Sequence, residues 1–356
     1  MTTLDSYITL GRSGLRVSPY CLGTMTFGED HGWGASVADS EAMLDTYLDR
    51  GGNFVDTANV YTGGHSEEIL GDAFVARPGL RDRVVLASKF FANLEPGNPN
   101  GGGTGRKALL GALHNSLRRL RTDYLDIYWI HNWDAGTPLE ETLRTLDDLV
   151  TAGTIRYIGF SDLPAWVSAR AQTLAELRGW SPAIALQLEY SLLERTVEGE
   201  LVPMARELGM GVMPWSPLRN GYLTGKHSRG SADARGGIVP GPTDAEWQVI
   251  DVLAQVAADA QTTMAAAALA WVRKRPSVTS TLIGARSVAQ LQANLDSLAL
   301  ELSDAQLEQL NEVSAPSLNF PADNNARFGP MLAFGGMTID GVAIPSRSIV
   351  AEPAAR

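Results

Sequence analysis

The chain has 356 residues, of which 44% are apolar and 19% charged, a composition typical of globular proteins with one large core or two small ones. Its net charge of −11 argues against a broad nucleic-acid-binding surface, because phosphate binding needs clustered Lys and Arg. No apolar stretch approaches the length of a membrane span, and the single cysteine, Cys21, excludes an internal disulfide framework. The N-terminus shows no secretory pattern, so the expected location is the cytoplasm.

Eight short apolar runs alternate with amphipathic stretches along the chain. The runs are apolar on both faces, as strands of a parallel sheet covered on both sides should be. Eight strand–helix units, mostly 25–40 residues apart, predict an α/β protein with a single (β/α)8 TIM barrel. The runs cover residues 18–25, 54–58, 84–90, 124–131, 155–162, 183–190, 211–217 and 280–286.

The helices between the runs have readable ends. Thr137 and Glu140 form a capping-box pattern around Pro138, and Gly153 ends the helix that follows. Thr104 is the expected cap of a second helix with a leucine stripe over 109–120.

Two segments depart from the strand–helix pattern. A glycine-rich polar loop follows the seventh run, over residues 219–243, before a helix from about Asp244. The chain therefore divides into a barrel over 1–314 and an irregular C-terminal tail over 315–356. The tail carries Phe320, Phe328 and Phe334, which are too apolar for a solvated segment, so we expect it to fold back over the barrel mouth.

Polar residues gather at the ends of the predicted strands. In a (β/α)8 barrel the chemistry lies at this end of the strands, so these residues should converge on one face. The strand-end residues are Asp56, Lys89, His131, Ser161, Asp162, Gln187, Tyr190, Trp215, Ser216, Pro217, Gly284, Ala285 and Arg286.

Three of these positions, together with Tyr61, suggest proton transfer. Asp56 and Lys89 can pair, which lowers the free-energy penalty of burying two charges. Tyr61 follows Asp56 by five residues, and a nearby ammonium favours the phenolate, lowering the phenol pKa towards neutrality. His131 can donate a hydrogen bond to an incoming carbonyl oxygen. Each residue also has a structural interpretation: a stabilising ion pair, a loop tyrosine and a hydrogen-bonded core histidine. Their joint placement at strand ends favours a site.

From about Leu10 to Val313 the sequence resembles the aldo-keto reductases, in the bacterial branch similar to the voltage-gated potassium channel β-subunits. The resemblance rests on stretches such as LGTMTFG, FVDTANVY with SEEILG, VVLASK, YLDIYWIH, LQLEYSLLER, PWSPLRNGYLTGK and LIGARSVAQLQANL. It implies a catalytic tetrad of Asp56, Tyr61, Lys89 and His131. It also implies hydride transfer from a reduced nicotinamide to a carbonyl carbon, with Tyr61 as the proton donor.

The usual G-x-G-x-x-G fingerprint is absent after a strand, so a dinucleotide needs another mode of binding. The resemblance implies a nicotinamide cofactor extended across the barrel mouth. Position 162 is Asp where many relatives have Asn, and a carboxylate cannot donate as an amide does. Arg286 and Lys226 favour a 2′-phosphate and hence NADP(H). The implied cofactor residues are Gly23, Thr24, Met25, Asp56, Ser161, Asp162, Gln187, Trp215, Ser216, Pro217, Leu218, Asn220, Gly221, Lys226, Gly284, Arg286, Gln290 and Asn294.

Several residues keep a second interpretation. Asp162 can simply cap the next helix, and Gln290 can form half of a capping box with Ser287. The loop aromatics Trp33, Phe91 and Trp133 are candidate substrate-pocket walls or ordinary packing residues. The GGGTGRK stretch over 101–107 lacks phosphate-loop spacing and is interpreted as a flexible loop. The remaining histidines show no ligand spacing, so no metal is expected.

The first functional hypothesis is an NADP(H)-dependent reductase of aldehydes or ketones. The alternative is an NADPH-binding regulatory or sensor subunit with vestigial activity, but the related channel subunits lack a histidine at position 131. A two-carboxylate hydrolase is a third hypothesis, and it needs paired acids at the mouth. The expected partner is a small carbonyl substrate, without nucleic acid or membrane; a homo-oligomer remains open.

Overall fold

The computed structural model describes residues 2–230 and 241–346, and within them all eight predicted runs form strands. The strands pair in parallel in the order β10-β3-β4-β5-β6-β7-β8-β9. The ring is nearly closed by a bridge between Val212 and Val278, where the Val212 amide donates to the Ser277 carbonyl at 2.9 Å. The barrel strands are β3 (Tyr20–Gly23), β4 (Phe54–Asp56), β5 (Val85–Phe90), β6 (Leu125–Ile130), β7 (Ile155–Ser161), β8 (Ala183–Glu189), β9 (Gly211–Trp215) and β10 (Thr281–Ile283).

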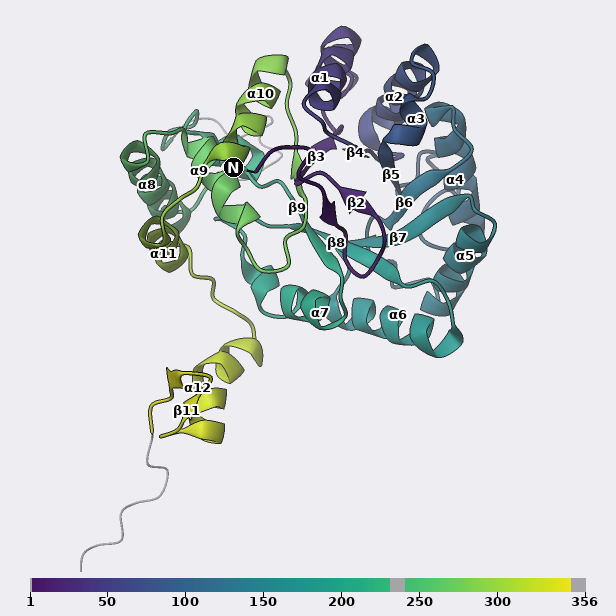
Figure 1. Ribbon diagram of the computed structural model, residues 1–356. Helices are drawn as coiled ribbons and strands as arrows, with labels where there is room; N and C mark the ends of the chain where they lie inside the picture. The colour runs from purple at the N-terminus through teal and green to yellow at the C-terminus, as the bar shows by residue number, and fades with distance from the viewer. Residues whose placement is uncertain (1, 231–240, 347–356) are drawn as a thin grey trace, which may run out of the picture.

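Helices surround the strands on the outside of the ring (Figure 1). Their apolar stripes pack on the outward side chains of the strands, which is why the strands are apolar on both faces. The helices are α1 (Val37–Asp49), α2 (His65–Ala76), α3 (Leu80–Arg83), α4 (Arg106–Leu120), α5 (Leu139–Thr151), α6 (Ala165–Arg178), α7 (Leu201–Glu207), α8 (Asp244–Asp259), α9 (Met264–Arg273), α10 (Val288–Asp296) and α11 (Asp304–Val313), with 3-10 turns η1 (Tyr61–Gly64), η2 (Thr196–Glu198), η3 (Arg219–Thr224) and η5 (Ser297–Ala299).

A second apolar cluster fills the inside of the barrel. It contains Phe54, Trp129 and Cys21, so the lone cysteine is a buried core residue, as expected. Gly159 faces the Trp129 ring, and a Cβ there would overlap that ring. The N-terminal hairpin, β1 (Ile8–Thr9) with β2 (Arg16–Val17), contributes to the same cluster through Val17.

Two predicted helix caps are wrong in detail. Helix α5 begins at Leu139 without a side-chain cap, because the Thr137 hydroxyl donates to Asp134 at 2.6 Å. Helix α4 begins at Arg106, and the Thr104 amide also donates to Asp134, at 2.9 Å. Asp134 thus ties the loop before α4 to the loop before α5. The end of α5 is as predicted, with Gly153 in the left-handed region at φ 75°.

The C-terminal tail does not lie over the barrel mouth. After α11, the helix α12 (Ala322–Phe334) and the hairpin β11 (Thr338–Ile339) with β12 (Val342–Ala343) extend to one side of the barrel (Figure 1). Helix α12 has no buried residue, and Phe320 is 83% exposed. In the loop after β9, the predicted helix start is confirmed by a capping box of Thr243 with Glu246. Residues 231–240 of that loop lie outside the described residues.

A buried polar network fixes the segment that carries Tyr61. Glu67, in the first turn of α2, is fully buried and accepts hydrogen bonds from Arg119 Nε at 2.7 Å and Ser88 Oγ at 2.5 Å. Arg119 also packs under Gly64, where a Cβ would come within 2.8 Å of its Nε atom. The network therefore links α4 and the start of α2 to β5, one residue before Lys89.

We expect Glu67→Gln to destabilise the fold by about 3 kcal/mol, because it leaves Arg119 largely buried without its counter-charge. Chemical denaturation gives the change in the free energy of unfolding. The matched control is Glu140→Gln, which removes an ion pair with Arg170 whose side chains are 44% and 48% exposed. This control should change stability by less than about 1 kcal/mol. Equal effects in the two variants would contradict a special role for the buried network.

Candidate active site

The predicted strand-end residues at inward positions point into the barrel mouth because side chains alternate along a strand. Tyr190 and Ala285 do not: they occupy outward positions and are buried in the core between strands and helices. Each inward position lies two residues beyond an interior core residue, as Lys89 lies beyond Ala87 and His131 beyond Trp129. The same alternation places five further residues at the mouth, each two residues after an interior residue of its strand. They are Gly23 after Cys21, Asp56 after Phe54, Ser161 after Gly159, Gln187 after Ala185 and Trp215 after Met213.

Asp56 and Lys89 form a fully buried ion pair, as predicted from their neighbouring strands. Lys89 Nζ donates to Asp56 Oδ2, to the Thr57 carbonyl at 2.9 Å and to the Tyr61 hydroxyl at 3.0 Å. These three contacts use all three protons of the ammonium. The other oxygen of Asp56 accepts from Gln187 Nε2 at 3.1 Å. The pair is thus satisfied on both sides and presents Tyr61 to the mouth.

Tyr61 reaches this position because the chain turns sharply after β4. Thr62, Gly63 and Gly64 all have positive φ, and two of the three are glycines, which adopt such angles without strain. Thr62 is held in its unfavourable conformation by donating from Oγ1 to the Phe27 carbonyl at 2.9 Å. The edge of the Tyr61 ring then meets His131, with ring centroids 6.0 Å apart at 82°.

The environment sets the protonation state of each group. Burial by itself would lower the pKa of Lys89, but Asp56 and Tyr61 outweigh it and hold the pKa above its usual value, so Lys89 stays charged. Burial raises the pKa of Tyr61, and Lys89 only partly opposes this. The expectation that the pKa of Tyr61 is lowered is therefore wrong for this structure. Tyr61 is a neutral phenol with a proton to give.

His131 is a neutral imidazole in this site. Burial, followed by the charge of Lys89, lowers the pKa of His131 to about 3. A neutral ring can donate one hydrogen bond without carrying charge. This state matches the sequence-based expectation that His131 donates to a carbonyl oxygen.

Several of the implied cofactor residues form a connected rim beside the ion pair. Asp162 has φ 53° and accepts from Trp215 Nε1 at 3.1 Å, so it does not cap the helix that begins at Ala165. Its backbone amide donates to the Gln187 carbonyl at 3.3 Å. Ser161 is buried directly before it. On the other side, Thr24 Oγ1 donates to the Asp56 carbonyl at 3.1 Å, between Gly23 and Met25.

The loop after β9 contains consecutive residues in the left-handed backbone conformation. Arg219, Asn220 and Gly221 all have positive φ, and the Asn220 amide donates to Ser216 Oγ at 3.3 Å. Lys226 folds back onto Gly221, where a Cβ would meet its Nζ atom at 2.5 Å. Pro217 is buried and Leu218 packs on the outer core, so these two support the loop from beneath.

The segment after β10 is open and basic. A Cβ at Gly284 would meet no atom within 4 Å, and Arg286 is exposed without a salt bridge to any described residue. Gln290 Oε1 accepts from the Arg286 amide at 3.0 Å, and the Ser287 hydroxyl caps the helix by accepting from the Gln290 amide at 3.3 Å. Asn294 donates to the Gly284 carbonyl at 3.3 Å. An exposed guanidinium beside a helix start, across the mouth from a stacking tryptophan, fits a phosphate-bearing nicotinamide dinucleotide.

Aromatic side chains line the outer loops of the mouth. Trp133 follows β6 and meets Trp166, at the start of α6, edge to face with centroids 5.9 Å apart. Trp33 stacks with His31 at 6.0 Å, and Phe91 follows β5 directly. Sequence reasoning missed Trp166, although an aromatic residue at the start of a helix that follows a barrel strand marks the mouth side.

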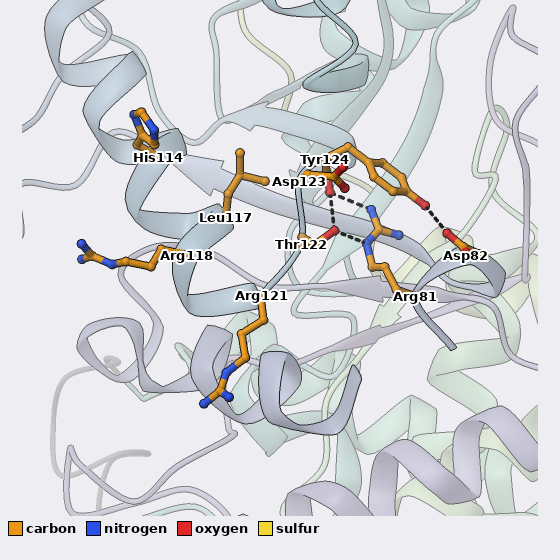
Figure 2. Close-up of a pocket in the computed structure, with 9 residues that line it drawn as sticks. All are labelled: Arg81, Asp82, His114, Leu117, Arg118, Arg121, Thr122, Asp123 and Tyr124. Carbon is orange, nitrogen blue, oxygen red and sulfur yellow. Dashed lines mark hydrogen bonds between the residues drawn. The ribbon is translucent and has the colours of Figure 1, made fainter. Parts of the chain in front are cut away.

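The structure contains two open hollows of similar size. One, of about 550 Å³, lies at the opposite end of the barrel, where Arg81 donates to Thr122 and the Tyr124 carbonyl (Figure 2). Arg81 also donates to Asp126 at 2.9 Å, and that end of a barrel generally serves stability. The other, of about 460 Å³, adjoins Asp162 and Trp215 at the mouth. The proton-transfer group lies only at the mouth end.

Comparison with known proteins agrees with this geometry. The model of the Aldo/keto reductase family matches residues 19–315. The chain is 34% identical to an aryl-alcohol dehydrogenase of Pestalotiopsis microspora, over 91% of this chain and 84% of that one. It is 34% identical to the norsolorinic acid reductase of Aspergillus flavus, over 87% and 81%. It is also 34% identical to the aryl-alcohol dehydrogenase [NADP(+)] of Phanerodontia chrysosporium, over 86% and 85%.

Among the described residues no helix is long and apolar enough to cross a membrane, and no group of three metal-ligating side chains occurs. The barrel, the mouth residues and the similarity along most of the chain lead to one assignment. The chain belongs to the aldo-keto reductase family and is an oxidoreductase that interconverts carbonyls and alcohols.

Proposed function

We propose that the chain is an NADP(H)-dependent carbonyl reductase in which Tyr61 is the proton donor. The observation that carries this proposal is the hydrogen-bonded chain from Asp56 through Lys89 to the Tyr61 hydroxyl, which faces the barrel mouth. When bound, the cofactor supplies a hydride. Tyr61 then provides the proton that the reduced oxygen needs, and Lys89 stabilises the phenolate left behind.

His131 orients the substrate carbonyl and does not act as an acid. With a pKa of about 3 it carries no proton to release at neutral pH, whereas Tyr61 is protonated there. One group therefore donates the proton and the other positions the oxygen. Asp56 acts through Lys89, because its carboxylate is fully buried and accepts hydrogen bonds from Lys89 and Gln187.

The 2′-phosphate preference rests on Arg286. An exposed guanidinium without a salt bridge among the described residues can pair with a dianion in a bidentate fork. One of the similar proteins carries NADP(+) in its name, which supports the same choice.

Aromatic aldehydes are the proposed substrate class. Trp133 and Trp166 provide an edge-to-face pair at the mouth, a surface suited to another flat ring. Two of the similar proteins are named as aryl-alcohol dehydrogenases.

We expect Tyr61→Phe to lower the turnover of an aromatic aldehyde by about 10²- to 10⁴-fold, because the phenyl ring keeps the packing but has no proton. The measurement is the loss of NADPH absorbance, with NADPH binding followed by fluorescence as the control. Tight binding with negligible turnover already in the native chain would favour a regulatory or sensor role. Undiminished turnover in the variant would overturn the role of Tyr61.

The variant Arg286→Ala should weaken NADPH binding by about tenfold or more and leave NADH binding nearly unchanged, since only NADPH carries the 2′-phosphate. Dissociation constants for both cofactors test this. Gln290→Ala is the matched control, because Gln290 lies in the same turn without a charge. If NADH binding weakens as much as NADPH binding, Arg286 does not select the phosphate.

The depressed pKa of His131 predicts a dependence of stability on pH. The unfolded chain binds this proton near pH 6.5 and the folded chain only near pH 3, so protons favour unfolding progressively as the pH falls between these values. Replacing His131 by Gln should reduce the loss of unfolding free energy between pH 6.5 and 4.5 by about 2 kcal/mol. Urea denaturation at both pH values measures this difference. Parallel losses in the native chain and the variant would show that His131 is not held neutral.

A further inference from the structure

Asp162 carries a charge in the barrel mouth that has no counter-charge in contact with it in the described part of the chain. Lys89 is paired with Asp56, and Arg219 is paired with Glu189. Asp162, in contrast, makes no salt bridge with any described residue and accepts only the neutral N–H of Trp215, at 3.1 Å. The carboxylate therefore adds one negative charge at the edge of the Trp215 ring.

The surroundings of Asp162 determine when this charge is present. Asp162 is exposed at the rim of the mouth, and the partial desolvation of its carboxyl raises the pKa to about 6, with the Trp215 hydrogen bond opposing the rise and the negative charge of Glu189 adding to it. Lys89, across the mouth, also opposes the rise. Asp162 is consequently ionised at neutral pH and loses its charge as the pH falls through about 6.

The two redox forms of a nicotinamide differ in charge at the ring. The oxidised ring carries a positive charge and the reduced ring is neutral, while the phosphates are the same in both. A nearby carboxylate attracts only the oxidised ring, in the way that a neighbouring charge shifts a pKa. Its oxygen can also accept a hydrogen bond from a carboxamide N–H, as an amide oxygen would.

We propose that Asp162 makes this chain bind the oxidised cofactor, relative to the reduced one, more tightly than an amide at the same position would. The inference rests on the proposed function and places the nicotinamide beside Trp215 and Ser161, two of the implied cofactor residues. By linkage, tighter binding of the oxidised form shifts the equilibrium between the bound forms towards the oxidised cofactor and the alcohol by the same factor. The charge therefore makes hydride donation from the bound cofactor to a carbonyl more favourable than an amide would.

The decisive variant is Asp162→Asn. It has the same shape, can still accept the Trp215 hydrogen bond, and tolerates φ 53° as aspartate does. The variant removes the charge and replaces one acceptor oxygen by an amide donor, but it keeps the shape of the side chain, so it should fold. Dissociation constants for NADP+ and NADPH, measured by quenching of tryptophan fluorescence at pH 7.5, give the ratio of the two affinities. We expect this preference for NADP+ to fall by about tenfold in the variant, mainly through weaker NADP+ binding.

Glu194→Gln is the matched control. Glu194 lines the same hollow as Asp162 and Trp215, but its side chain contacts Thr196 and not Trp215. Removing its charge should change the ratio of the two affinities less than about twofold, because Glu194 does not contact Trp215 and its charge is screened by salt. An equal change in the two variants would overturn the assignment to Asp162 and indicate a general charge effect.

The pH dependence gives an independent check. In the native chain the preference for NADP+ should decrease as the pH falls from 7.5 to 5.5, whereas in Asp162→Asn it should stay flat. Ionisation of the 2′-phosphate affects both cofactors alike and cancels in the ratio. An unchanged ratio in Asp162→Asn, with both cofactors bound, would overturn the inference and leave the proposed function intact. Failure of the native chain to bind either cofactor would instead overturn the proposed function.

Discussion

The buried ion pair between Asp56 and Lys89 is the constraint on which the rest of the site depends. Neither charge has contact with solvent, so each must be satisfied by protein groups that occupy fixed places on neighbouring strands. The carboxylate takes its second hydrogen bond from Gln187 on β8, and the ammonium gives its last proton to Tyr61. Satisfying this one pair therefore fixes the tyrosine in the barrel mouth.

Tyr61 and His131 are held in place without carrying a charge themselves. The buried Glu67–Arg119 pair anchors the turn that carries Tyr61, some distance from the chemistry. His131 stays neutral because it is buried near a fixed cation. Asp162 is the exception, a charge held by a single neutral donor at the rim. In the proposed function, the residues that move the proton are thus separate from Asp162, whose charge acts on the cofactor.

Sequence patterns predicted the barrel and the placement of Asp56, Lys89 and His131, because apolar runs ending in polar residues follow directly from the alternation of side chains along a strand. Contacts between distant elements escaped prediction. Thr104 and Thr137 were predicted to cap the helices that follow them. Instead, Asp134 accepts hydrogen bonds from the Thr104 amide and the Thr137 hydroxyl. The raised pKa of Tyr61 arises from the desolvation of its hydroxyl group. The spacing of apolar residues in the sequence does not show this. The tail was misplaced because its apolar content predicted burial, whereas α12 has no buried residue and Phe320 is 83% exposed.

The residues proposed for proton transfer lie on or just after strands that are consecutive both in the chain and in the ring. Asp56, Tyr61, Lys89 and His131 all lie within residues 56–131, on the adjacent strands β4 to β6, and most of the proposed cofactor contacts come from β7 to β10. These four residues are therefore encoded within one continuous segment of the gene. Recombination at the end of β6 could exchange this segment between related barrels as a unit, leaving each parent's cofactor half intact.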